Sequence, residues 1–160
     1  MSSKKHIDIL VIGSGPGGYA AAYRAADLGR KVIIVDKDPT LGGVCLNRGC
    51  IPSKTLLHIA KVLEETESLK KMGVSFAKPK IDINTVRDWK NKIIKQLSGG
   101  IAQMAKARKV ETIEGVATFI SDKEIQVERK SDKENITFDH CIIAAGSSSS
   151  RIPGIPFDNK

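Results

Sequence analysis

Hydrophobic residues near the start of the chain form two short, mostly apolar runs. The first extends from Ile7 to Ile12 and is followed by glycine, and the second covers 32–35. Such runs are typical of strands that are buried on both faces of a parallel sheet. The alanine-rich stretch between them, 16–28, predicts a helix capped by Gly29. This order predicts a strand–helix–strand unit in a parallel sheet.

The middle of the chain has a helical pattern. The stretch from residue 53 to about 71 predicts a second helix. A third helix, with Asp82 or Asn84 as its N-cap, is predicted more strongly because apolar residues recur three or four positions apart. These residues are Val86, Trp89, Ile93, Leu97, Ile101 and Met104. The glycine pair 99–100 interrupts this pattern, and we expect it to bend the helix.

After Lys109 the apolar period becomes two. The alternation in VATFI, EIQVE and NITFD predicts a small antiparallel β-meander over about 111–138. The apolar segment HCIIAAG then returns the chain to the main sheet. We therefore expect an α/β fold, a doubly wound parallel sheet with an inserted meander, in a domain covering 1–146. The serine, glycine and proline content of 147–160 predicts a linker.

Composition narrows the class of protein. With 41% hydrophobic and 28% charged residues, the 160-residue chain is typical of a soluble globular protein. No apolar run approaches the roughly 20 residues that span a bilayer, and no secretory signal is evident, so we expect a cytoplasmic protein without membrane contact. The formal charge is +8, but lysines alternate with acids, which favours a solvated surface over nucleic-acid binding.

Three glycines follow the first predicted strand with the spacing of a nucleotide-binding loop. Gly13, Gly15 and Gly18 form G-x-G-x-x-G between that strand and the first helix, and Asp36 ends the second strand. The glycines permit a tight turn, close approach of a pyrophosphate and close packing of helix on strand, while the acid can bind ribose hydroxyls. This context predicts a dinucleotide site without saying which dinucleotide it takes.

Two of the three cysteines, Cys45 and Cys50, lie in GGVCLNRGCIPSK, residues 42–54, which we expect to form a tight loop before a helix. A structural disulfide or two plain thiols is one interpretation, but cytosolic proteins rarely keep structural disulfides. A zinc site is another, yet Cys141 and the three histidines supply no second ligand pair, so no metal site is expected.

The favoured interpretation is a dithiol that cycles between reduced and oxidised forms. Cys50 precedes a predicted helix, whose N-terminal partial charge favours the reactive thiolate. Because a catalytic dithiol must pass on two electrons beside a dinucleotide site, a flavin is the natural acceptor.

Together with VIGSGPGGYAAAYRAADLG, VDKDPTLGG and IIAAGS, the cysteine segment resembles the N-terminal FAD-binding part of the pyridine nucleotide-disulfide oxidoreductases. The resemblance extends from about residue 7 to 146. It implies an oxidoreductase in which electrons pass from a substrate dithiol through the cysteine pair and FAD to NAD+. The third predicted helix is closest to members that oxidise dihydrolipoamide. The implied partners are therefore the lipoyl domains of 2-oxoacid dehydrogenase complexes, and the implied enzyme is a homodimer.

The resemblance also implies roles for single residues. Cys45 is the interchange thiol that meets the substrate, Cys50 is the thiol that exchanges electrons with FAD, and Asp36 holds the adenosine ribose. Lys54 is implied beside the flavin ring and Ala117 near the adenine. The implied FAD contacts also include Gly13, Gly15, Gly18, Lys37, Gly42, Gly43, Val44, Cys45 and Gly146.

The resemblance covers about the first third of a family member. The family's NAD site, dimerisation domain and catalytic histidine–glutamate pair have no counterpart in these 160 residues. We therefore expect the 160-residue chain alone to be inactive, to bind FAD weakly and to expose apolar surface. The alternatives are a non-catalytic FAD-binding or redox-sensing module, and another disulfide reductase of the same family.

Overall fold

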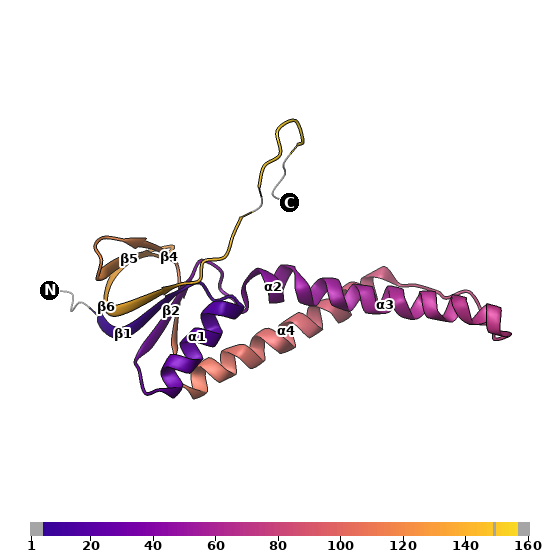
Figure 1. Cartoon of the computed structure of the whole chain (residues 1–160), viewed down its shortest axis with the longest axis horizontal. Helices are drawn as coiled ribbons and strands as arrows, with labels where there is room; N and C mark the ends of the chain where they lie inside the picture. Colours follow the sequence, from indigo (N-terminus) through magenta and orange to yellow (C-terminus); the bar gives the residue numbers. More distant parts are fainter. Residues whose placement is uncertain (1–4, 149, 157–160) are drawn as a thin grey trace.

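The computed structural model describes residues 5–148 and 150–156 (Figure 1). Its elements are β1 (Lys5–Ile12), α1 (Pro16–Asp27), β2 (Val32–Asp36), α2 (Gly43–Arg48), α3 (Cys50–Ser68), the 3₁₀ turn η1 (Leu69–Met72), α4 (Ile83–Ala107), β3 (Glu111–Glu114), β4 (Val116–Phe119), β5 (Glu124–Glu128) and β6 (Lys133–Ile143). The strands form one six-stranded sheet in the order β3-β2-β1-β6-β5-β4. Three pairs of neighbouring strands are parallel, namely β1–β2, β1–β6 and β2–β3. The other two pairs, β4–β5 and β5–β6, are antiparallel. The α/β class is confirmed.

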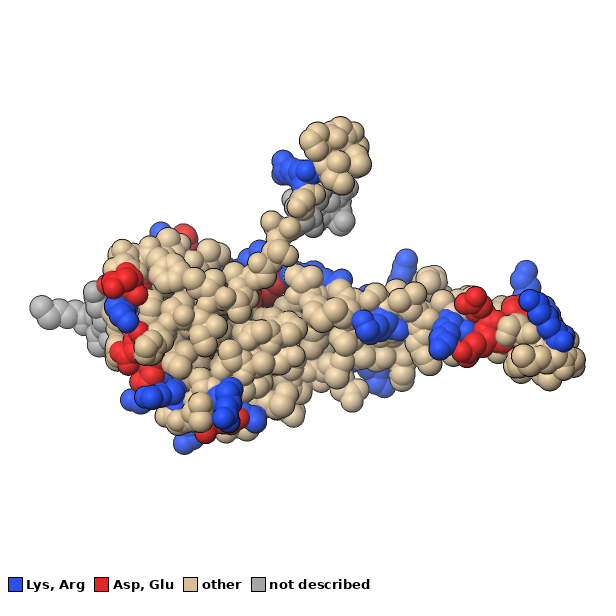
Figure 2. Space-filling model, viewed as in Figure 1, with Lys and Arg blue, Asp and Glu red and all other residues tan. Residues whose placement is uncertain are grey.

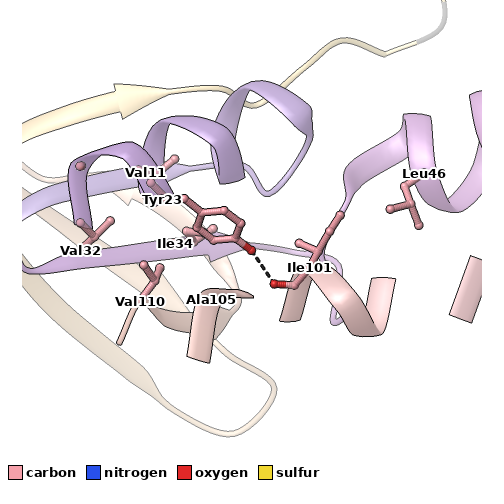
Figure 3. Packing of buried hydrophobic residues seen from close by; sticks show 10 residues of the cluster. Val11, Tyr23, Val32, Ile34, Leu46, Ile101, Ala105 and Val110 are labelled. Carbon is pink, nitrogen blue, oxygen red and sulfur yellow. Dashed lines mark hydrogen bonds between the residues drawn. The ribbon is translucent and has the colours of Figure 1, made fainter. Parts of the chain in front are cut away.

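Helices α1 and α4 cover one face of the parallel strands. Val32 and Ile34 of β2 point to this face and pack with Tyr23 of α1 and Ile101 of α4 (Figure 3). The Tyr23 hydroxyl donates a 2.6 Å hydrogen bond to the Ile101 carbonyl, which satisfies a polar group inside the apolar cluster. This contact fixes the second half of α4 against α1.

The opposite face is covered by the antiparallel strands. Ile33 of β2 packs there, in one buried cluster with Ile125, Val127 and Ile136 from β5 and β6. All four side chains are at most 1% exposed. Burial of each contributes about 1.5–3 kcal/mol relative to an exposed position. The strands buried on both faces that the sequence predicts are therefore present.

The predicted meander boundaries, 111–138, differ from the structure at both ends. Residues 111–114 form β3, which pairs in parallel with β2 and belongs to the main sheet. At the other end, β6 is one 11-residue strand that joins the predicted third meander strand to the returning segment. Its start pairs with β5, and 136–143 pair with β1. Sequence periodicity predicted strands correctly here but cannot assign their partners.

The predicted loop over 42–54 is also wrong, because most of it is helical. The helix α2 covers Gly43–Arg48, and α3 begins directly at Cys50 rather than near residue 53. Only Gly49, with φ −123° and ψ −100°, separates them. Pro52 is compatible with this start because it lies in the first turn of α3, where an amide needs no intrahelical acceptor.

Residues 52–93, called the arm below, project from the sheet as two helices that lie side by side (Figure 1). The predicted N-cap is confirmed, since the Asp82 carboxylate accepts from the amides of Asn84 and Thr85. The helix α4 continues unbroken through 99–100. None of the arm residues is buried. Leu57 is 64% and Trp89 53% exposed, so the arm carries apolar surface of the kind expected from the sequence.

The surface carries both signs of charge. Basic and acidic side chains lie next to one another on the sheet end of the molecule and near the tip of the arm (Figure 2). No helix in the part of the chain that the structure describes is long and apolar enough to cross a membrane. In the predicted linker, the described residues 147, 148 and 150–156 form neither helix nor strand, while 149 and 157–160 lie outside the described residues.

Candidate functional site

The carboxyl ends of β1, β2 and β6 meet at one edge of the sheet. The Gly13 amide donates to the Val35 carbonyl at 2.8 Å, and the Ala144 amide donates to the Ile12 carbonyl at 2.7 Å. The loops that follow these strands enclose a cleft of about 480 Å³, and a smaller hollow of about 230 Å³ adjoins it beside β4. Both are lined by Gly13, Asp36, Lys37 and Ala145. Clefts at this end of a parallel sheet are the usual place for ligands.

The predicted glycine loop forms the floor of the cleft. A Cβ on Gly13, whose φ is +102°, would lie 2.2 Å from the Ala144 carbonyl oxygen. A Cβ on Gly18 would lie 1.9 Å from the Gly13 carbonyl oxygen, so α1 packs directly on the loop. Gly15 differs, because a Cβ added there would have no neighbouring atom within 4 Å. It lines the cleft as the N-cap of α1, where unpaired amides and the helix dipole favour an anion.

Asp36 is held at the junction of the two hollows. Its Oδ2 accepts hydrogen bonds of 2.6 Å from both the amide and the hydroxyl of the fully buried Ser14. Its Oδ1 accepts from the Asp38 amide at 2.9 Å. Burial acts to raise the pKa of Asp36, but these hydrogen bonds outweigh it and lower the pKa below its ordinary value. The carboxylate is therefore ionised at neutral pH and retains acceptor capacity for a ribose hydroxyl.

The two cysteines of the motif come together across the break between α2 and α3. Cys45 lines the cleft, and Cys50 is the first residue of α3. Both are free thiols. Interaction with the Cys50 thiol is the main cause that raises the pKa of Cys45, and the nearby Lys54 ammonium acts to lower it. The geometry therefore presents a paired dithiol at one end of the cleft.

The start of α2 packs directly on the glycine loop. The Gly42 amide donates to the Ser14 carbonyl at 2.9 Å. A Cβ on Gly43 would lie 2.6 Å from the Gly15 Cα, and Gly42 and Gly43 have φ values of +113° and +60°. A larger residue at Gly43 would separate the two segments. The glycine loop and the dithiol are thus one packed unit.

Most of the predicted site residues meet in or beside this cleft. Its lining includes Gly13, Gly15, Asp36, Lys37, Gly43, Val44, Cys45 and Gly146. Ala117 lines the adjoining hollow with Asp36. Gly18 and Gly42 do not line the cleft but allow close packing of the segments that form it. Lys54 is exposed on α3 and lines neither hollow.

Sequence reasoning gave no role to Ser14, which holds Asp36, or to Arg48, which lines the cleft. Arg48 carried a usable signal, since it is the one charged residue between the two cysteines.

The third cysteine lies away from this site. Cys141 is partly buried against the second apolar cluster, and burial raises the pKa of its thiol. Cys141 is therefore a packing residue of β6. Among residues 5–148 and 150–156, no three His, Cys, Asp or Glu side chains are grouped so as to hold a metal ion.

Comparison with known proteins gives consistent matches. The family model described as pyridine nucleotide-disulphide oxidoreductase matches residues 7–160. The chain is 50% identical over 159 residues to a dihydrolipoyl dehydrogenase of Buchnera aphidicola, covering 99% of this chain and 34% of the relative. It is 49% identical to that of Vibrio cholerae, with the same coverage. For Geobacillus stearothermophilus the identity is 42%, covering 96% of this chain and 32% of the relative.

The chain spans about a third of the length of the curated relatives that it matches. The family model, in contrast, matches nearly all of the chain, including both the glycine loop and the cysteine pair. The chain belongs to the pyridine nucleotide-disulphide oxidoreductase family.

Proposed function

We propose that the cleft binds FAD and that Cys45 and Cys50 carry out the thiol–disulfide exchange of a dihydrolipoyl dehydrogenase. One observation carries this proposal: Cys45 lines the same cleft as the glycine loop and Asp36, and Cys50, the first residue of α3, lies close enough to raise the pKa of Cys45. A dithiol at one end of a dinucleotide cleft is arranged to exchange electrons with a bound redox cofactor.

The lining of the two hollows fits a flavin dinucleotide from end to end. Asp36 and Ala117 line the smaller hollow, which suits an adenosine whose ribose donates to the carboxylate. The open space over Gly15 and the first turn of α1, which contains no acidic residue, suit the diphosphate. The remaining end, lined by Val44 and Cys45, suits the isoalloxazine ring. We assign the domain 1–146 to this role.

The bonds and electrons of a disulfide exchange balance between the cysteine pair and a dithiol substrate. In the oxidised protein, a substrate thiolate attacks the Sγ of Cys45, the Cys45–Cys50 bond breaks, and its electron pair goes to Cys50 as a thiolate. The second substrate thiol then closes the substrate disulfide and releases Cys45. Two electrons and two protons pass from the substrate to the protein dithiol.

Bound FAD would accept these two electrons and pass them to NAD+. Lys54 supports the protein's part of the exchange, because its ammonium acts to lower the pKa of Cys45 and so opposes the larger effect of Cys50, which raises it. We assign it to charge compensation at the dithiol. It is exposed on α3 and is not part of the cleft lining.

The names of the relatives support an assignment of the substrate, and the family resemblance supports an assignment of the partners. Because the similar proteins from Buchnera and Vibrio are named dihydrolipoyl dehydrogenase, we assign dihydrolipoamide as substrate. We assign lipoyl domains of 2-oxoacid dehydrogenase complexes as its carriers, a homodimer as the enzyme and the cytoplasm as its location.

The proposal is tested by thiol titration and absorbance of the chain mixed with FAD. We expect mild oxidation to remove two titratable thiols, leaving Cys141 free. Cys45→Ser and Cys50→Ser should each abolish this paired loss, whereas the matched control Cys141→Ser should retain it. Partial reduction of the FAD-bound chain should give a long-wavelength absorbance from a thiolate in contact with the ring, and Cys50→Ser should remove it.

Two results would contradict the proposal. Failure of the wild-type chain to take up FAD at any concentration would remove the cofactor site. FAD binding without a Cys45–Cys50 disulfide and without the long-wavelength band would instead identify a binding module with no redox function.

A further inference from the structure

We propose that Arg48, between the two cysteines, binds a phosphate group of the dinucleotide. This inference rests on the proposed nucleotide function of the cleft and adds a contact that the glycine motif does not contain. Arg48 is the last residue of α2 and lines the larger cleft together with Gly15 and Gly17 at the N-terminus of α1. A cation therefore lies on the same cleft as the helix N-terminus.

The guanidinium of Arg48 is positioned by Asp38. The two side chains form an ion pair through Nη2 and Oδ2, with the Arg48 side chain 56% exposed and the Asp38 side chain 25% exposed. The Asp38 amide in turn donates to Oδ1 of Asp36 at 2.9 Å. Since a guanidinium has five donor hydrogens, the pair with Asp38 leaves donors of Arg48 for a second acceptor.

The charges along the cleft favour this role. The ionisable side chains other than the thiol that line it are two acids, Asp36 and Asp38, and two bases, Lys37 and Arg48. A diphosphate brings further negative charge beside the two carboxylates. Without Arg48 the acids that line the cleft would outnumber the bases by one, which would weaken the attraction for the ligand. A planar guanidinium suits phosphate oxygens because it can donate two parallel hydrogen bonds.

The competing explanation is that Arg48 only ties α2 to the segment after β2. The two roles are separable because Asp38 takes part in the tie but carries the wrong charge for a phosphate. Asp38→Asn breaks the ion pair and frees the guanidinium, whereas Arg48→Gln removes the cation. If the pair is only a structural tie, both substitutions should change ligand affinity in the same way. If Arg48 binds phosphate, Arg48→Gln should weaken ADP binding and Asp38→Asn should not.

The experiment is calorimetric titration of the 160-residue chain with ADP, AMP and adenosine at one fixed salt concentration. The variants are Arg48→Gln, Arg48→Lys, Asp38→Asn and the control Arg87→Gln, which removes an equal charge from an exposed position of α4. Circular dichroism and thermal unfolding confirm that each variant is folded.

We expect Arg48→Gln to weaken ADP binding about tenfold or more, as loss of a charge-assisted hydrogen bond does. Adenosine affinity should stay within about twofold, since adenosine has no phosphate for the cation to bind. Asp38→Asn should bind ADP at least as tightly as wild type, Arg48→Lys should be intermediate, and Arg87→Gln should be unchanged.

Three outcomes would overturn the inference. Unchanged ADP affinity in Arg48→Gln rules out the contact. Equal weakening of all three ligands by Arg48→Gln and Asp38→Asn assigns the pair to the structural tie. A wild-type chain that binds neither FAD nor any of the three ligands removes the nucleotide site itself, and that result is distinct from a failure of Arg48 alone.

Discussion

The sheet with its cleft and the arm are stabilised differently. In β2, four of five residues are buried, and both faces are packed by elements distant in sequence. In the arm, none of the residues 52–93 is buried, and helical hydrogen bonds with the Asp82 cap supply the order. Because packing rather than propensity supplies most helical stability, the two regions should respond very differently to equivalent substitutions.

The sharpest comparison uses the same change in both regions. Leu10→Ala removes a side chain that is 0% exposed, and we expect a loss of about 3–5 kcal/mol in the free energy of unfolding. Leu57→Ala removes one that is 64% exposed, and we expect a change within about 0.5 kcal/mol. Urea unfolding followed by circular dichroism measures both. Equal losses would show that the arm is packed as tightly as the sheet.

Two helical glycines give a smaller contrast. Gly18→Ala places a Cβ 1.9 Å from the Gly13 carbonyl oxygen, and we expect a loss of about 2–3 kcal/mol as the loop is displaced. Gly100→Ala, with no atom within 4 Å of the added Cβ, should gain about 0.5–1 kcal/mol because alanine favours the helix. Thermal unfolding of the two variants tests this. A stable Gly18→Ala protein would show that the close packing of α1 on the loop is dispensable.

Acid should reveal the smallest difference between the regions. The pKa of Asp36 is lowered in the folded chain by hydrogen bonds from Asp38 and Ser14. The pKa of Asp82 is lowered by hydrogen bonds from Thr85 and Asn84. Each carboxylate therefore stabilises the fold at pH values above the ordinary aspartate pKa of about 3.9. This contribution is lost as the pH falls through the pKa of the folded state.

Substitution of Asp36 or Asp82 by asparagine removes the titrating carboxylate. Asp36→Asn should flatten the acid side of the stability curve, measured by urea unfolding from about pH 6 to pH 3. Asp82→Asn should flatten it less, because the Asp82 carboxylate is solvent-exposed and asparagine remains a good N-cap. If Asp82→Asn had the larger effect, the cap of the arm would matter more to folding than the half-buried Asp36 carboxylate and its hydrogen bonds.

The sequence predicted the elements and residues whose chemistry is local. The glycine spacing, the apolar runs of β1 and β2 and the Asp82 cap are each determined by nearby residues, and the structure contains all of them. The helical form of 43–48 was missed because it depends on Gly43 packing against Gly15, a contact between segments distant in the chain. The partner of β3 was missed for the same reason.

The cleft shows the same division. Asp36 was predicted from its position after β2, but the buried Ser14 that holds it is one of the variable positions in the glycine motif. Arg48 was overlooked because its proposed role depends on the ion pair with Asp38 and on its position in the cleft lining. No sequence spacing predicts either contact. Side chains whose role depends on a tertiary neighbour are therefore the ones that sequence reasoning leaves out.

The continuity of β6 links a peripheral hairpin to the cleft. Ile136 and Thr137 pair with β5 on one side and β1 on the other, and the same strand leads to Ala144, Ala145 and Gly146 at the cleft. One residue inserted between 137 and 143 would move this rim by about 3.3 Å and turn its side chains to the opposite face. The turn at 129–132 precedes the strand and can change length without that effect, so an insertion is compatible with the cleft at the hairpin tip but not a few residues later.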